Sequence, residues 1–248
     1  MHEKYLRLAK EAAARAGEFL SKRKNIDVCE NLAHDIKLSS DRESEKIILE
    51  CLSESGLPVL SEECGFVGEE QNLRWIVDPL DGSVNYFKGM DELCCVSIAL
   101  FAGDEPVLGV INRYACGELF CGAAGRGADL NGNPIKPSDI CRLSEAVIAT
   151  GFPAGRNYSD EKLMGFVHRV QRVKKVRMLG TAALMAAFVS CGRIDAYFEE
   201  GICLWDVAAA MAIVKSAGGA VSLTAKDGFK CDFGAFATDM LKGDFYGS

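Results

Sequence analysis

The sequence has no uninterrupted apolar stretch of the roughly 18 residues that are needed to cross a membrane. From Met1 to Lys10, charged residues alternate with apolar ones, so the hydrophobic segment of a secretion signal is also absent. We therefore expect a soluble, cytoplasmic protein with no membrane partner.

Basic residues are in the minority, since 28 Lys and Arg stand against 35 Asp and Glu and leave a net charge of −7. A protein that binds nucleic acid needs basic side chains to neutralise the phosphate backbone. We therefore expect no nucleic-acid partner. The acidic balance is compatible instead with a cluster of carboxylates that holds a metal.

Several common catalytic motifs are also absent. The sequence contains no GxxxxGK phosphate-binding loop, and its Gly122, Gly125 and Gly127 do not have the spacing of a dinucleotide-binding fingerprint. Only three histidines occur, and none lies near a nucleophile motif, which argues against a Ser-His-Asp hydrolase. The 11 cysteines include no CxxC pair for zinc, and their odd number without a secretion signal indicates reduced, mostly buried thiols.

The first half of the chain begins with helical patterns and continues with strands. Apolar residues recur at helical spacing over the first twenty residues, and Ser40 followed by Glu43 predicts a capped helix that ends before Gly56. Short β-rich runs are then found at 58–60, 75–77, 94–101, 107–112 and 119–123, and Asn131-Gly132 predicts a tight turn.

The second half alternates strands and helices. Predicted strands lie at 146–150, 174–178 and 194–198, and predicted helices at 159–171, 181–191 and 206–216. Such alternation is typical of a layered α/β unit. We therefore expect an α/β (α+β) protein with an N-terminal α+β domain at 1–140 and a C-terminal α/β domain at 141–248.

The segment from Trp75 to Tyr86 is the strongest candidate for a metal site. An apolar strand ends at Asp78, Pro79 stiffens the following turn, and Asp81 precedes a glycine. The two carboxylates and the carbonyl between them are oxygen ligands of the kind that Mg²⁺ prefers. The alternative is an ordinary turn, because Asp-Pro and Asp-Gly are common turn dipeptides.

Two further acidic positions follow the same logic. The pair Glu62-Glu63 comes directly after another short strand and can bring carboxylates to the same edge, although a glutamate pair is usually a solvated surface feature. Asp206 opens an alanine-rich helix, where a structural N-cap is the alternative explanation. Each position taken alone favours the structural explanation, and the combination favours a metal site.

These motifs together resemble the signatures of the inositol monophosphatase family. The resemblance rests on Glu62-Glu63, on Asp78-Pro-Leu-Asp81-Gly-Ser83, and on Trp205-Asp206 followed by Ala217-Gly218-Gly219, in the family's order and across nearly the whole chain. The family comprises magnesium-dependent, lithium-sensitive phosphatases, including inositol-1-monophosphatase and related fructose-1,6-bisphosphatases. The resemblance implies a layered αβαβα sandwich and a homodimer.

The resemblance also implies roles for individual residues. Two or three Mg²⁺ would be held by Glu62, Asp78, the Leu80 carbonyl, Asp81 and Asp206, with Glu63 in support. Asp41, Glu62 and Ser83 would be catalytic, with Asp41 and Ser83 activating the water that attacks phosphate and no phosphoenzyme forming. The amides of Gly82 and Ser83 would cradle the phosphate. Asp41 has a structural alternative as a stabiliser of its helix N-terminus, and Ser83 stands where the family more often has threonine.

On the substrate side, the resemblance assigns substrate binding to Ala182 and Glu199 as well as to Asp81, although both could be ordinary strand-end and helix-start residues. We expect hydrolysis of inositol 1-phosphate to inositol and phosphate. The alternatives are a fructose-1,6-bisphosphatase, a histidinol-phosphate phosphatase, a 3'-phosphonucleotide phosphatase, or a catalytically silent metal-binding regulator. Residues 151–156 and the basic residues between 169 and 177 favour the bisphosphatase, although solvated helix charges also explain the basic run.

Overall fold

A computed structural model describes residues 2–22, 27–31, 36–152 and 159–247. Its helices are α1 (His2–Ser21), α2 (Ser39–Leu52), α3 (Ser83–Lys88), α4 (Asp160–Val170), α5 (Ala182–Val189), α6 (Leu204–Ala217) and α7 (Asp239–Tyr246). Its strands are β1 (Val28–Asn31), β2 (Ile36–Leu38), β3 (Val59–Ser61), β4 (Gly65–Val67), β5 (Leu73–Asp81), β6 (Cys95–Ala102), β7 (Glu105–Arg113), β8 (Glu118–Ala123), β9 (Gly127–Leu130), β10 (Asn133–Pro134), β11 (Val147–Thr150), β12 (Lys175–Arg177), β13 (Ala196–Cys203), β14 (Ala220–Ala225) and β15 (Lys230–Phe236).

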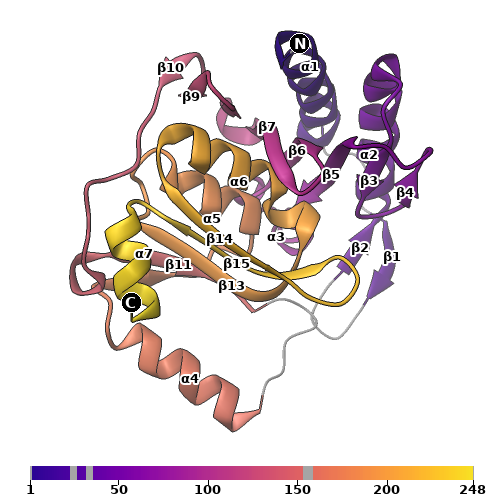
Figure 1. The fold of residues 1–248 in the computed structure, drawn as a ribbon. Helices are drawn as coiled ribbons and strands as arrows, with labels where there is room; N and C mark the ends of the chain where they lie inside the picture. The colour runs from indigo at the N-terminus through magenta and orange to yellow at the C-terminus, as the bar shows by residue number, and fades with distance from the viewer. Residues whose placement is uncertain (1, 23–26, 32–35, 153–158, 248) are drawn as a thin grey trace.

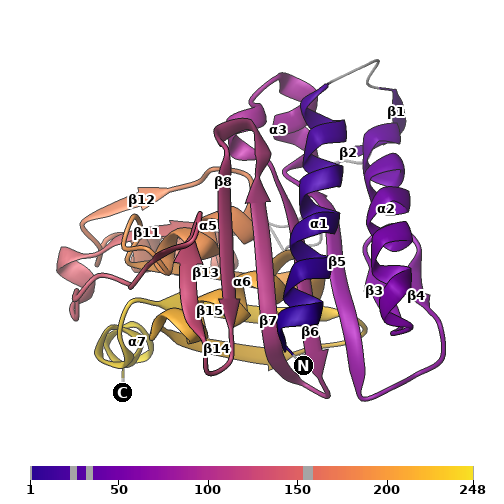
Figure 2. The same ribbon diagram turned by 90° about the horizontal axis from the view of Figure 1, so that it is seen from above.

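The elements form five layers, helix on sheet on helix on sheet on helix (Figures 1 and 2). Helices α1 and α2 cover the outer face of the larger sheet, α5 and α6 lie between the two sheets, and α7 covers the outer face of the smaller sheet. The layered αβαβα sandwich implied by the resemblance is therefore confirmed.

The larger sheet has the strand order β10-β9-β8-β7-β6-β5-β3-β4. All its neighbouring strands are antiparallel except β3 and β5, which run parallel to each other. Because parallel neighbours end at the same edge, the residues after β3 meet those at the end of β5. This pairing brings two of the predicted acidic motifs together.

The smaller sheet has the strand order β12-β11-β13-β15-β14. Strand β11 is parallel to both of its neighbours, whereas β15 is antiparallel to β13 and β14. The β14–β15 hairpin was not among the predicted elements, and β13 extends to Cys203 where the prediction ended at residue 198. The longer β13 carries the chain directly into α6.

The two halves of the chain share one hydrophobic core. Helix α5 is buried along its whole length, as expected for a helix that is apolar on every side. The core that surrounds it combines residues of the larger sheet, such as Ile76, with residues of the smaller one, such as Tyr197 and Phe233. The larger sheet ends at Pro134 and the smaller begins at Val147, while the division into domains at residue 140 stays a prediction.

Helix α6 packs against the larger sheet through glycines. A Cβ atom at Gly109 would lie 2.2 Å from the carbonyl oxygen of Ala209, and one at Gly122 would lie 2.6 Å from the Cα atom of Ile213. Neither position has room for a side chain, so the helix backbone rests directly on β7 and β8. The N-terminal turn of α6, which carries Asp206, is thereby set at a fixed height over the sheet.

We expect Gly109→Ala to lower the free energy of unfolding by about 3 kcal/mol, because the added methyl group forces α6 away from the sheet. Chemical denaturation measures this difference. Gly165→Ala is the matched control, since a Cβ there meets no atom within 4 Å in the exposed part of α4; it should raise stability by roughly 0.5–1 kcal/mol. Equal stability of Gly109→Ala and the wild type would contradict the close packing.

The start of α2 differs from the predicted capping box. The N-cap is Leu38 instead of Ser40, so the helix begins at Ser39, two residues earlier than expected, and the backbone N–H of Leu38 donates to Oδ2 of Asp41 at 2.6 Å. Asp41 therefore holds the first turn of α2 in place of the Ser40 and Glu43 pair. The tight turn at Asn131-Gly132 is confirmed, with both residues at positive φ.

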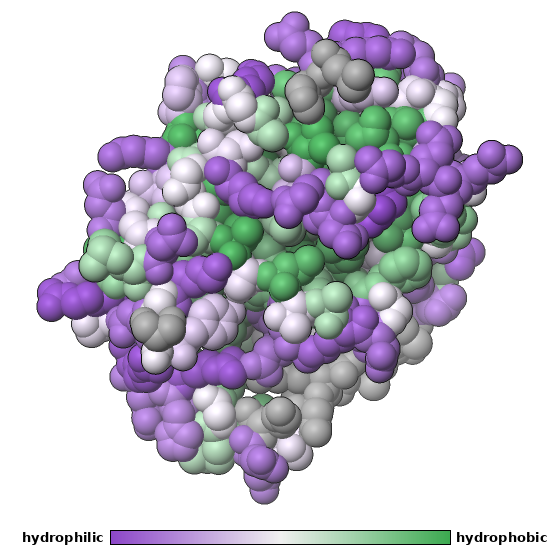
Figure 3. Space-filling model, viewed as in Figure 1, coloured by the Kyte–Doolittle hydropathy of each residue, from purple (hydrophilic) through white to green (hydrophobic). Residues whose placement is uncertain are grey.

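Hydrophilic residues follow most of the outline of the face seen in Figure 3, and hydrophobic residues gather toward its middle. None of the helices in the described part of the chain is both long and apolar enough to span a membrane.

Candidate active site

Strands β3 and β5 deliver acidic side chains to one edge of the larger sheet. Ser61 of β3 is paired with Val77 of β5, and the N–H of Glu62 donates to the Val77 carbonyl at 3.3 Å. The side chain after β3 therefore lies beside Asp78. The ladder to β6 is irregular between Asp78 and Asp81, so the Asp-Pro-Leu-Asp turn departs from regular pairing.

Three carboxylates converge from distant parts of the chain. One carboxylate oxygen from each of Glu62, Asp78 and Asp206 lies within 4.8 Å of the others. Burial, followed by the charges of Glu62 and Asp81, raises the pKa of Asp78 well above its ordinary value, and burial with the charge of Glu62 does the same for Asp206. Such crowding is costly unless a cation neutralises it, and an all-oxygen donor set fits Mg²⁺.

Asp206 reaches this cluster from the first turn of α6. It is the third residue of the helix, and its Oδ2 accepts a hydrogen bond from the N–H of Cys203 at 3.1 Å. The alternative in which Asp206 is the N-cap is therefore wrong, because Cys203 holds that position. Asp206 and Asp41 occupy equivalent helix positions on opposite sides of the larger sheet, one on α6 and one on α2.

Asp81 lies beside the cluster and is held by the start of α5. Its carboxylate accepts hydrogen bonds from the Thr181 hydroxyl at 2.5 Å and from the N–H groups of Ala182 at 3.2 Å and Ala183 at 2.8 Å. The Cys95 thiol lies 3.8 Å from the same carboxylate. Burial raises the pKa of Asp81, and these donors oppose that rise. The second half of the chain thus orients an acidic residue of the first.

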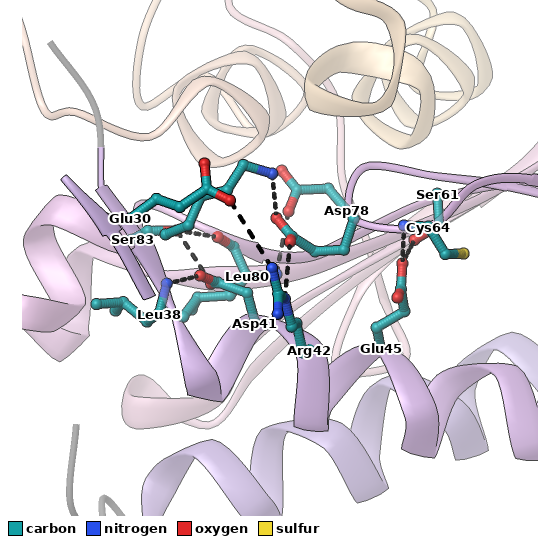
Figure 4. A network of polar contacts seen from close by, with 12 residues as sticks. Glu30, Leu38, Asp41, Arg42, Glu45, Ser61, Cys64, Asp78, Leu80 and Ser83 are labelled. Atoms are coloured by element: carbon teal, nitrogen blue, oxygen red, sulfur yellow. Dashed lines mark hydrogen bonds and ion pairs between the residues drawn. The ribbon is translucent and has the colours of Figure 1, made fainter. Parts of the chain in front are cut away.

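Ser83 lies between Asp41 and the Leu80 carbonyl (Figure 4). The Ser83 Oγ is 3.1 Å from Oδ1 of Asp41 and 3.1 Å from the carbonyl oxygen of Leu80. A hydroxyl carries one proton, so Ser83 can donate to only one of these acceptors at a time. The predicted pair of Asp41 and Ser83 is therefore in direct contact, at the end of the strand that carries Asp78.

Gly82 makes the turn that exposes the start of α3. Its φ of 93° lies in the left-handed region, and a Cβ there would lie 2.7 Å from the Leu93 carbonyl oxygen. Only glycine fits these two conditions. Gly82 and Ser83 both line the cavity described below.

The segment that carries the glutamate pair is anchored by a buried acid of α2. The Ser61 hydroxyl and the Cys64 N–H both donate to Oε1 of Glu45, the latter at 3.1 Å (Figure 4). These contacts lie on either side of Glu62 and Glu63. Glu45 therefore fixes the turn from which Glu62 reaches the cluster.

Glu63 does not join the cluster and instead pairs with cations. Its side chain is only 5% exposed, its Oε1 lies 2.8 Å from Nζ of Lys37, and its Oε2 lies 3.8 Å from Nε of Arg42. Burial acts to lower the pKa of Lys37, but the hydrogen bond that Lys37 donates to Glu63 and the nearby acidic charges together raise it. Glu63 is thus a neighbour of the cluster, and its supporting role stays a prediction.

A cavity of about 440 Å³ opens beside these groups. Its volume is within the range of small-molecule sites. The predicted site residues that line it are Glu62, Asp78, Leu80, Asp81, Gly82, Ser83, Ala182, Glu199 and Asp206. Asp41 and Glu63 do not line it; Asp41 contacts the cavity residue Ser83, and Glu63 pairs with Lys37.

The basic residues that were considered for a second phosphate lie away from this cavity. Arg169 pairs with Glu200 at 2.6 Å, and Arg172 lies 3.8 Å from Asp244. Lys230 is the one basic residue among the described residues that line the cavity. Gly151 and Phe152 also line it, whereas residues 153–156 of the same motif lie outside the described residues.

Sequence reasoning missed several residues of the site. Thr181, Lys37 and Cys95 are separated by many residues from the groups they contact, and no local pattern marks them. Tyr197 had a visible signal, because it lies two residues before Glu199 on a predicted strand and so projects from the same face.

The chain is similar to known proteins over most of its length. The sequence profile of the inositol monophosphatase family matches residues 1–238. An inositol-1-monophosphatase of Mesorhizobium japonicum is 38% identical over 86% of this chain and 82% of its own length. The Nus factor SuhB of Xylella fastidiosa is 37% identical over 93% of this chain and 82% of its own length. The solved inositol monophosphatase of Anabaena superposes with a TM-score of 0.85 at 34% identity, over 98% of this chain and 94% of that one.

Proposed function

Because the chain belongs to the inositol monophosphatase family, we propose that it is a magnesium-dependent, lithium-sensitive phosphatase of small polyol or sugar phosphates, with inositol 1-phosphate as its foremost substrate. The observation that carries this proposal is the convergence of Glu62, Asp78 and Asp206 within 4.8 Å, beside a cavity of the right size. A purely structural protein has no need of this cluster, whose buried charges are costly.

The ligands of two or three Mg²⁺ are Glu62, Asp78, the Leu80 carbonyl, Asp81 and Asp206. When bound, Mg²⁺ lowers the pKa of water and neutralises negative charge on the phosphate. The ligand set is supported by its chemistry, since every donor is an oxygen. Asp81, held rigidly by α5, needs little rearrangement to bind an ion.

The remaining residues move a proton and hold the phosphate. Ser83 accepts a proton from the attacking water and passes its own to Asp41, whose carboxylate is 3.1 Å away. The amides of Gly82 and Ser83 cradle the phosphate at the start of α3. Water attacks phosphorus in line and the ester oxygen leaves, so no side chain forms a covalent bond to phosphorus.

The cavity wall supports a monophosphate over a bisphosphate. A second phosphate group is usually bound by arginine or lysine, and Lys230 is the one basic residue on the described wall. Ala182 and Glu199 also line the cavity, and the Glu199 carboxylate is suited to accept hydrogen bonds from polyol hydroxyls.

On the family resemblance and on the composition of the sequence, we further propose that the protein is a homodimer that acts in the cytoplasm.

We expect kcat/KM to rise as the pH increases through about 7, because Asp41 must be ionised to accept a proton. Burial is the main cause that raises the pKa of Asp41 to about 7, and the charge of Glu63 adds to it. The Leu38 N–H, Ser83 and Lys37 act in the opposite direction. A pH profile of kcat/KM with inositol 1-phosphate measures this limb, which Asp41→Asn should remove. The same limb in Asp41→Asn would contradict the role of Asp41.

The substrate is tested by phosphate release with Mg²⁺ from inositol 1-phosphate, fructose 1,6-bisphosphate, histidinol phosphate and adenosine 3',5'-bisphosphate. Asp81→Asn is the inactive control. The largest kcat/KM is expected with inositol 1-phosphate, and a clear preference for another compound would reassign the substrate within the family. Failure of the folded protein to hydrolyse any of them would favour a catalytically silent regulator.

A further inference from the structure

We propose that Tyr197 is a positioning residue for substrate specificity, which holds the Glu199 carboxylate in the orientation that receives a polyol hydroxyl, in a space that Gly151 leaves open. This inference rests on the proposed function, because it concerns the substrate of the same cavity. It adds two residues, Tyr197 and Gly151, that act on the alcohol part of the substrate through the orientation of Glu199.

A buried hydrogen bond links the two side chains. The Tyr197 hydroxyl donates to Oε2 of Glu199 at 2.8 Å, and the two residues lie two positions apart on β13, on the same face. Tyr197 is fully buried and Glu199 is 6% exposed. Glu199 lines the cavity, whereas Tyr197 lies behind it in the core. The tyrosine therefore holds the carboxylate from the side that faces away from substrate.

Tyr197 is itself held firmly and keeps its proton. Its ring packs against Phe233 with the ring centroids 6.1 Å apart, and its strand neighbours are Ala149 on β11 and Ala235 on β15. Burial and the adjacent Glu199 charge raise the pKa of Tyr197 well above its ordinary value. The hydroxyl is thus a permanent donor, and a hydrogen bond to a carboxylate is stronger than one between neutral groups.

Gly151 provides the space in which the carboxylate lies. Strands β11 and β13 are parallel with Thr150 opposite Phe198, so the next residue along, Gly151, falls beside Glu199. A Cβ at Gly151 would lie 2.7 Å from Oε2 and 3.0 Å from Oε1 of Glu199. Any larger residue would push the carboxylate out of this position. Tyr197 on β13 and Gly151 after β11 therefore together determine the orientation of the Glu199 carboxylate.

A change in the orientation of the Glu199 carboxylate should affect recognition of the alcohol part of the substrate and not of its phosphate. In the proposed function the phosphate is held by residues other than Glu199, at the cluster and at the start of α3. Loss of the Glu199 orientation should weaken the binding of an alcohol that has hydroxyls to donate. A phosphate ester whose alcohol has no further hydroxyls, such as phenyl phosphate, gains nothing from Glu199.

The test compares Tyr197→Phe and Gly151→Ala with the wild type on inositol 1-phosphate and phenyl phosphate. Loss of a hydrogen bond to a charged group predicts that Tyr197→Phe raises KM for inositol 1-phosphate about tenfold, with kcat within about twofold. Gly151→Ala should act in the same direction, and phenyl phosphate kinetics should stay within about twofold for both. In the background Glu199→Ala, adding Tyr197→Phe should cause no further loss.

Tyr86→Phe is the matched control, because its buried hydroxyl donates to the Leu20 carbonyl at 2.9 Å and plays no part in the cavity. It should leave both KM values unchanged, and thermal unfolding confirms that each variant is folded. An equal loss on both substrates, or an unchanged KM for inositol 1-phosphate, would overturn the proposal. If the wild type hydrolyses phenyl phosphate but no polyol phosphate, both the polyol substrate and the role of Tyr197 are wrong, while the phosphatase activity stands. If it hydrolyses neither compound, the proposed phosphatase function itself is wrong.

Discussion

Asp78→Asn should lose Mg²⁺-dependent phosphate release by roughly three orders of magnitude or more, a loss as large as that seen when a principal electrostatic group is removed. Asp78 is fully buried between Glu62, Asp81 and Asp206, and its Oδ1 accepts the Leu80 N–H at 3.0 Å. Asparagine keeps the shape of the side chain and removes its charge. The measurement is kcat/KM for inositol 1-phosphate at saturating Mg²⁺.

Asp129→Asn is the control for this experiment. Asp129 is also buried, but it lies on β9 and accepts hydrogen bonds from Arg126 at 2.7 Å and from the Gly132 N–H at 2.9 Å, away from the cavity. Its replacement is expected to lower stability and to leave kcat/KM close to that of the wild type. Activity of Asp78→Asn within about tenfold of the wild type would mean that Asp78 does not hold a catalytic ion.

Mg²⁺ should raise the unfolding temperature of the wild type by about 5–10 °C, because an ion at about 100 times its Kd adds about 2.7 kcal/mol of stability and each kcal/mol shifts a chain of this size by about 2–4 °C. The physical reason is the mutual repulsion of Glu62, Asp78 and Asp206, which only the folded chain brings together. Differential scanning calorimetry with Mg²⁺ and with a chelator measures the shift.

Asp206→Asn provides the converse test of the same repulsion. Removing one charge from the cluster should make the protein more stable than the wild type in chelator, since burial and like charges raise the pKa of Asp206 and so disfavour its ionised form. The variant should also lose most of the Mg²⁺-induced rise. A chelated variant less stable than the wild type, with its Mg²⁺ response intact, would show that the cluster does not bind the ion.

The parts of the fold that local patterns determine could be predicted from the sequence. The strand that delivers Asp78 was recognisable because an apolar run precedes a proline, although β5 continues through Pro79 to Asp81. The alternation of strands and helices in the second half indicated the layers, and the structure has them in that order. The start of α2 was misplaced because Asp41, rather than Ser40, satisfies the free N–H group there.

Long-range contacts could not be predicted in the same way. The bonds from Thr181 and the start of α5 to Asp81 join residues about a hundred positions apart, and the sequence offers no spacing rule for them. The packing of α6 on the larger sheet could not be predicted for the same reason. Gly109 and Gly122 look like ordinary strand glycines in the sequence, and only the structure shows that α6 rests on them. The resemblance to the family supplied the roles of Glu62, Asp78 and Asp206, and the geometry supplied their convergence.

The most direct test of the central claim is phosphate release from inositol 1-phosphate by the wild-type protein as Mg²⁺ is added to a chelated sample. We predict no release above background in chelator, and turnover that rises with Mg²⁺ to saturation. Release that is the same with and without Mg²⁺, or none at any Mg²⁺ concentration from a protein that calorimetry shows to be folded, would contradict a metal-dependent phosphatase.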